Sequence, residues 1–115
     1  MGGEPWLIRK KHEADAEKTL AKYRDEILKL TPDWPEIRIG EADQSYDSAF
    51  CCLIPFSQSQ LVDLFGTETP QSSVSTNDIW RLIFWEDIER GQGRYFVLHA
   101  GDKPEECCFL GYSFD

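Results

Sequence analysis

The sequence predicts an α+β fold: an antiparallel sheet of about five strands, with a long N-terminal helix and a short second helix packed on one face. Three observations support this prediction. One amphipathic segment near the N-terminus has helical periodicity, several later segments have the alternation or residue types of strands, and one carries helix start and stop signals. The length of 115 residues suits a single domain over residues 1–115.

The clearest helix is predicted over residues 10–30. Apolar residues recur there at spacings of three and four and form one stripe, while the other faces are charged. Pro32 and Pro35 cannot continue the backbone hydrogen-bond ladder, so the helix ends before them. The stripe covers too few heptads for a coiled coil, which favours packing against a core. Its members are Ala16, Leu20, Tyr23, Ile27 and Leu30.

The middle of the chain predicts two strands and the second helix. Residues 36–42 alternate apolar and polar side chains like a half-buried strand, and residues 48–56 (SAFCCLIPF) are typical of a buried one. Ser57 and Gln60 then fit a capping box at a helix start, and Gly66 fits its end. The polar, turn-rich segment that follows is expected to be a loop.

Residues 78–90 (DIWRLIFWEDIER) fit both a helix and a strand. A helix would have its buried face interrupted at Glu86, whereas the residue types are strand formers. The prediction is therefore a strand to about Trp85, followed by one turn of helix or a loop. With strands over residues 94–100 and 107–114, the C-terminal third becomes an antiparallel three-stranded meander.

The four cysteines form two adjacent pairs within apolar runs, at Cys51, Cys52, Cys107 and Cys108. Neighbouring residues on a strand point to opposite faces, so the pairs are poorly arranged to supply four ligands to one metal ion. A disulfide between the pairs and a redox switch remain alternatives. The acidic residues before the second pair disfavour a thiolate, so we expect four core-lining thiols and neither a metal nor a cofactor.

The charge distribution bears on possible partners. The net charge is −9, and residues 1–34 carry equal numbers of basic and acidic side chains, so the whole excess lies in residues 35–115. An acidic body repels nucleic acids and anionic membranes and attracts basic proteins. No apolar run reaches membrane-spanning length, and the first residues lack the apolar stretch and cleavage site of a signal peptide, so we expect a cytoplasmic protein with neither nucleic acid nor membrane as partner.

The main functional hypothesis is a small protein-interaction module of the inhibitor, immunity or adaptor type that binds a basic protein partner. Its expected contact residues are Trp85 as apolar anchor, with Glu86, Asp87 and Glu89 steering and pairing with Lys or Arg. The density of aromatic residues in the C-terminal third supports an exposed contact face.

Two other hypotheses stay open. One is a small-ligand-binding or enzymatic domain with Tyr95 and His99 lining a pocket of the sheet. The other is an assembly protein whose exposed sheet face forms a homodimer. No hydrolase, nucleotide-binding, metalloprotease or kinase signature appears in the sequence, so no catalytic residue is assigned and an enzyme is the less favoured reading.

Overall fold

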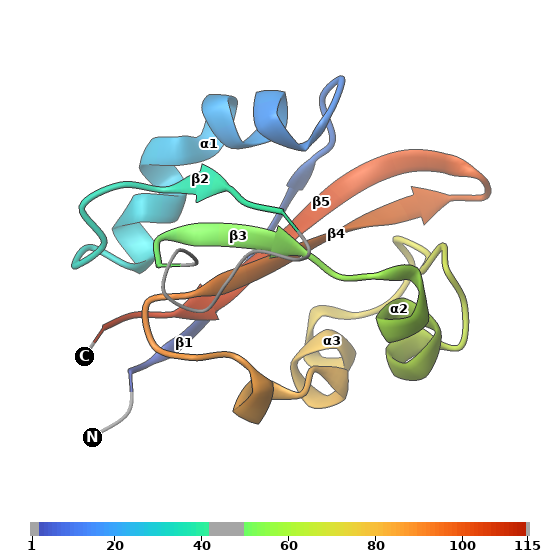
Figure 1. Cartoon of the computed structure of the whole chain (residues 1–115). Helices are drawn as coiled ribbons and strands as arrows, with labels where there is room; N and C mark the ends of the chain where they lie inside the picture. Colours follow the sequence, from blue (N-terminus) through green and yellow to red (C-terminus); the bar gives the residue numbers. More distant parts are fainter. Residues whose placement is uncertain (1–2, 42–49, 115) are drawn as a thin grey trace.

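The computed structural model describes residues 3–41 and 50–114, which form an α+β fold with five strands and three α-helices (Figure 1). A short 3₁₀ helix, η2, follows the third α-helix. In chain order the elements are β1 (Pro5–Lys11), α1 (Ala16–Leu30), β2 (Arg38–Ile39), β3 (Cys52–Pro55), α2 (Gln58–Phe65), α3 (Thr76–Leu82), η2 (Trp85–Asp87), β4 (Gly93–Ala100) and β5 (Lys103–Tyr112).

The sheet is mixed, which corrects the prediction of an antiparallel sheet. Its strand order is β1-β5-β4-β3-β2. The pairs β1–β5 and β5–β4 are antiparallel, whereas β4–β3 and β3–β2 are parallel. A parallel pair needs a long crossover between its strands, and the segment that carries α2, α3 and η2 supplies it between β3 and β4.

The first strand was not predicted, and the first helix starts later than predicted. Residues 5–11 pair with β5 along their whole length, so α1 is the second element of the chain. Asp15 caps α1, because its carboxylate accepts a hydrogen bond from the backbone N–H of Lys18 at 2.8 Å. The predicted apolar stripe faces the core in part: Leu20 and Ile27 are buried and Ala16 and Tyr23 are half-buried, whereas Leu30 at the end of α1 is exposed.

The strand predicted to end near Trp85 is wrong. Residues 76–82 are α3, whose N-cap Ser75 accepts a hydrogen bond from the backbone N–H of Asp78. Ile79 and Ile83, four residues apart, are both buried, so helical spacing decides the structure of this segment. The predicted three-stranded meander is therefore the two-stranded hairpin of β4 and β5.

Helices cover both faces of the sheet, and not one face as predicted (Figure 1). On one face, α1 and Trp34 pack on Trp6 and Phe109. On the other, α2, α3 and the segment after α3 pack on Phe96 and Leu110. The two short helices are needed because both faces of β4 and β5 carry large apolar side chains that lose free energy in water.

Two predictions about the middle of the chain are confirmed. The capping box at α2 is present with both of its hydrogen bonds, from Gln60 N–H to the Ser57 hydroxyl and from Ser57 N–H to the Gln60 side chain. Gly66 ends α2 in the left-handed conformation, with φ of 76°. The strand predicted over residues 48–56 is the shorter β3, and the one predicted over residues 36–42 is the two-residue β2. Residues 42, 48 and 49 of the two predicted strands lie outside the described residues.

The expectation of core-lining thiols is confirmed. All four cysteines are buried thiols: Cys52 packs with Ile54 in a small cluster of its own, and Cys107 and Cys108 are divided between the two faces of β5. Burial raises the pKa of the Cys107 thiol to about 11, and it raises the pKa of Cys51 and Cys108 as well. These thiols are therefore protonated at neutral pH. Within the described residues, no helix combines the length and the apolar character that a membrane crossing requires.

Candidate functional site

A cavity of about 250 Å³ opens between α2, η2 and β4. It forms where the crossover returns to the sheet, because two short helices leave a gap over the start of β4. The wall of this cavity combines four apolar side chains with three charged ones and one amide. They are Phe56, Leu64, Phe84 and Ile88, then Asp63, Asp87 and Arg94, and Gln60.

Arg94 is the cation of the cavity. It is the second residue of β4. Its neighbour Tyr95 packs on the α1 side of the sheet, so Arg94 projects to the opposite side, the one covered by α2 and α3. Its Nη1–H donates a hydrogen bond to the carbonyl oxygen of Gly93 at 2.9 Å. Among the described residues its guanidinium has no other hydrogen bond and no ion pair. Burial lowers the pKa of Arg94, and the negative charge of Asp87 partly opposes that shift.

Two carboxylates from different elements share the cavity with Arg94. Asp63 lies on α2 and Asp87 at the end of η2, and both residues are exposed. Within the described part of the chain, neither carboxylate makes a hydrogen bond or an ion pair. The guanidinium of Arg94 and the two carboxylates thus line the same cavity without forming ion pairs with one another.

Phe84 is the exposed aromatic residue at this cavity, and sequence reasoning missed it. With 53% of its surface exposed, it is the most exposed of the large apolar residues that the structure describes. Trp85, the predicted anchor, is half-buried. Its ring stacks on Trp80 with centroids 4.8 Å apart and meets Tyr112 edge-on at 5.5 Å. Its Nε1–H also donates to the backbone oxygen of Trp80 at 2.9 Å, so Trp85 holds η2 in place.

Only one of the three predicted acidic contact residues, Asp87, lines the cavity. Glu86 is exposed. The pKa of Tyr112 is raised mainly by burial of its hydroxyl and secondly by the negative charge of Glu86. Glu89 is exposed and borders a separate shallow hollow with Phe114. The three acidic residues therefore lie at the surface in and just after η2, and among them Asp87 is the one at the cavity.

The alternative pair, Tyr95 and His99, does not line this cavity. Tyr95 packs on the α1 side with its ring centroid 6.3 Å from that of Phe109, and burial raises its pKa. His99 lies at the far end of β4. Its backbone N–H donates to the carbonyl of Pro70, its carbonyl accepts from Ser72 N–H, and its Nδ1 is buried without a hydrogen-bond partner among the described residues.

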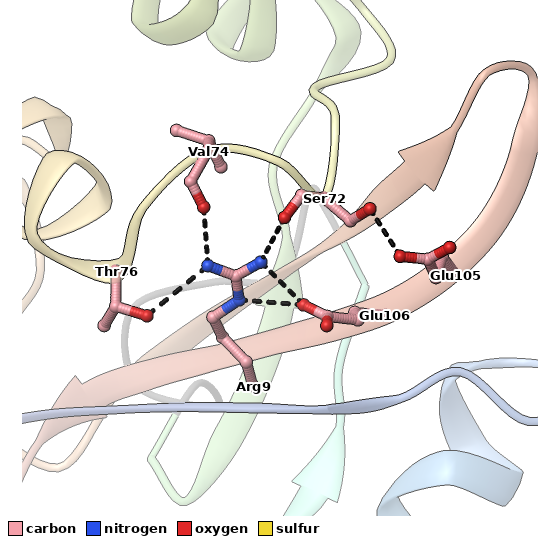
Figure 2. A network of polar contacts seen from close by, with 6 residues as sticks. All are labelled: Arg9, Ser72, Val74, Thr76, Glu105 and Glu106. Atoms are coloured by element: carbon pink, nitrogen blue, oxygen red, sulfur yellow. Dashed lines mark hydrogen bonds and ion pairs between the residues drawn. The ribbon is translucent and has the colours of Figure 1, made fainter.

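Arg9 fixes the loop that leads into α3 (Figure 2). From β1 its guanidinium donates to the carbonyl oxygens of Ser72 and Val74, each at 2.7 Å, and pairs with Glu106 of β5 at 2.8 Å. The Thr76 hydroxyl accepts a longer bond of 3.4 Å. One arginine thus ties the sheet to the segment that sets the position of α3 and, beyond it, of η2.

The described residues contain no group of three or more His, Cys, Asp or Glu side chains placed to hold a metal ion. No protein-family model, curated protein or solved structure matches this chain.

Proposed function

We propose that this chain is a protein-interaction module that binds a basic partner through the surface around Phe84. This Phe84 surface consists of Phe84 with the carboxylates of Asp63, Glu86, Asp87 and Glu89. Inhibitor, immunity and adaptor proteins are the kinds of protein that use such a module. A cytoplasmic location belongs to the proposal, supported by the four buried cysteine thiols, which a reducing compartment preserves.

One observation carries the proposal: an aromatic side chain that is 53% exposed stands at a cavity beside two carboxylates without ion-pair partners in the described chain. Exposed aromatic residues that become buried in an interface contribute a large share of binding energy. Unpaired carboxylates around them attract a basic partner and speed its association. Trp85 contributes indirectly, because its stacking on Trp80 holds η2 and so positions both Phe84 and Asp87.

The test is affinity capture from native lysate, with bound proteins identified by mass spectrometry and then purified for binding measurements. The variant D63K/D87K reverses two charges of the Phe84 surface. Its matched control, D25K/D102K, makes the same change in net charge at exposed positions on α1 and in the β4–β5 turn. We expect the unmodified chain and the control to retain one basic protein, and D63K/D87K to lose it.

The kinetics separate the two kinds of contact. F84A should mainly speed dissociation and weaken binding by about 2 kcal/mol, or roughly 30-fold. D63K/D87K should mainly slow association, with an effect that shrinks as added salt shortens the Debye length. Equal capture by D63K/D87K and D25K/D102K, together with an unaffected F84A variant, would place the contact elsewhere and refute the proposal.

A small-ligand-binding role is the second candidate, favoured by the convergence of polar groups on one cavity with apolar walls. Its central residue would be Arg94, because His99 does not line this cavity.

A further inference from the structure

Arg94 lines the cavity beside the Phe84 surface, and a partner with only basic groups would offer this cation nothing to bind. Its guanidinium carries five N–H donors, and within the described residues only one hydrogen bond is made, to the carbonyl of the preceding residue. Partial removal of a cation from water has a cost that one neutral acceptor does not offset. A carboxylate placed against the guanidinium would offset it, because two parallel charge-assisted hydrogen bonds match the geometry of both groups.

The aspartates of the cavity do not already fill that role. Asp87 acts on Arg94 through its charge, yet neither Asp87 nor Asp63 approaches the guanidinium within the 4.0 Å of an ion pair. The cavity therefore offers one site for an anion and two for a cation. A group that satisfies all three must carry both charges on a short apolar frame.

The size of the cavity limits that group to about one amino-acid residue. Its volume of about 250 Å³ lies below the range of roughly 300–1,000 Å³ that is usual for larger organic ligands. Phe84 and Phe56 supply apolar walls on which an aliphatic side chain can lie. A guanidinium or ammonium at the end of that side chain would reach the carboxylates at the rim.

We propose that the cavity captures the C-terminal residue of the basic partner, with the free α-carboxylate on Arg94 and the Lys or Arg side chain between Asp63 and Asp87. This inference rests on the proposed function and names the part of the partner that enters the site. Capture of a terminal carboxylate by fixed donors is a recurring mode of peptide recognition. It also gives specificity, because an internal Lys or Arg lacks the carboxylate and leaves Arg94 without a partner.

The test uses three small probes, titrated into ¹⁵N-labelled protein and followed by NMR chemical-shift changes. N-acetyl-L-arginine mimics a C-terminal arginine, N-acetyl-L-argininamide mimics an internal one, and N-acetyl-L-alanine keeps the carboxylate but lacks the cation. We expect the first probe to shift the resonances of Gln60, Phe84 and Asp87 and the side-chain Nε–H of Arg94. The other two should bind at least about tenfold more weakly, since each lacks one charged contact.

Variants assign the carboxylate to Arg94. In R94Q the acid and the amide should bind with equal affinity. R94K, which keeps the charge but lacks the planar fork, should show an intermediate preference. R81Q, an exposed arginine on α3, is the control and should leave the preference unchanged. Spectra that match the parent protein away from the cavity verify that each variant is folded.

The outcomes separate this inference from the proposed function. Equal binding of acid and amide to the unmodified protein, no binding of N-acetyl-L-arginine at the cavity, or an unchanged preference in R94Q overturns the carboxylate assignment. Capture of the whole partner by the Phe84 surface can survive any of those results. Conversely, if D63N/D87N leaves the affinity for N-acetyl-L-arginine and for the captured protein unchanged, the acidic contact of the proposed function fails as well.

Discussion

Replacement of Arg9 by Met should destabilise the protein and loosen the loop before α3. Met keeps most of the apolar stem that packs along β1 but removes every donor. The Ser72 and Val74 carbonyls then lose bonds of 2.7 Å each, and Glu106 loses its ion pair of 2.8 Å. No neighbouring side chain among these contacts can replace the guanidinium, because a single group currently serves both carbonyls and the carboxylate.

The expected magnitude follows from these contacts. Hydrogen bonds that involve a charged group contribute roughly 1.5–3 kcal/mol each when buried. The Arg9 side chain is 17% exposed and that of Glu106 is 31% exposed, so water replaces part of what is lost. We therefore expect a loss of about 3 kcal/mol in the free energy of unfolding, which corresponds to a fall of about 10 °C in Tm for a chain of this length.

The assay is urea unfolding combined with native-state hydrogen exchange, with Arg81→Met as control. Arg81 is 80% exposed, and among the described residues its one ion pair is with Asp78, three residues away on α3, so its loss should cost less than about 0.5 kcal/mol. In Arg9→Met the backbone amides of Ser72 and His99, which join the loop to β4, should lose protection. Equal unfolding midpoints for the two variants, or unchanged protection of these two amides, would refute the role assigned to Arg9.

Two further predictions concern the core. Burial raises the pKa of Cys107 from 9.0 to about 11, so the folded state binds this proton more tightly than the unfolded state. This contribution to stability is complete below about pH 9 and is lost as the pH rises toward 11, by at most roughly 3 kcal/mol. Urea titrations across that range should show this fall, and Cys107→Ala should make it shallower, with the rest due to the other buried thiols whose pKa is raised, Cys51 and Cys108; an identical pH dependence in both proteins would contradict the assignment. Gly93→Ala should cost about 2–3 kcal/mol, because the new Cβ would lie 2.6 Å from the Leu110 backbone oxygen. Gly66→Ala meets no atom within 4 Å and should cost only about 1 kcal/mol, from its positive φ; a larger loss at Gly66 than at Gly93 would show that backbone conformation outweighs crowding.

The sequence predicted those elements whose signals are local. The capping box of Ser57 and Gln60 and the stop at Gly66 describe α2 almost completely, because a cap satisfies backbone groups within a few residues of itself. The apolar stripe of α1 also follows from one segment alone. The burial of the cysteine pairs could be predicted because their strands are apolar on both sides.

The elements that depend on distant partners were missed. The charged end of β1, Arg9 to Lys11, has good helix formers, and only pairing with β5 makes it a strand. The parallel pairing of β3 with β4 joins residues about forty positions apart, which no local pattern encodes. In α3 the residue types favoured a strand, and the Ser75 cap together with the buried faces of Ile79 and Ile83 outweighed them.

The candidate site was predicted only in part, for the same reason. Asp87 was singled out from an acidic segment, and it does line the cavity. Arg94 was missed, although it shares an alternation with the buried Phe96 and Leu98. An arginine on the apolar face of a strand is a usable signal, but its meaning depends on which helices cover that face.

The position of the cavity is a consequence of how the sheet is covered. A parallel return from β3 to β4 is usually bridged by one long helix, whose apolar face covers the strands beneath it. Here the bridge is divided into α2 and α3, with a loop between them that Arg9 ties to the far edge of the sheet. Divided cover leaves the start of β4 exposed to a cavity, and the residue at that point is Arg94. The contacts of Arg9 and the charged cavity therefore belong to one crossover. Arg9 fixes the loop in its middle, where α3 begins, and the cavity lies at its end, where the chain rejoins the sheet after η2.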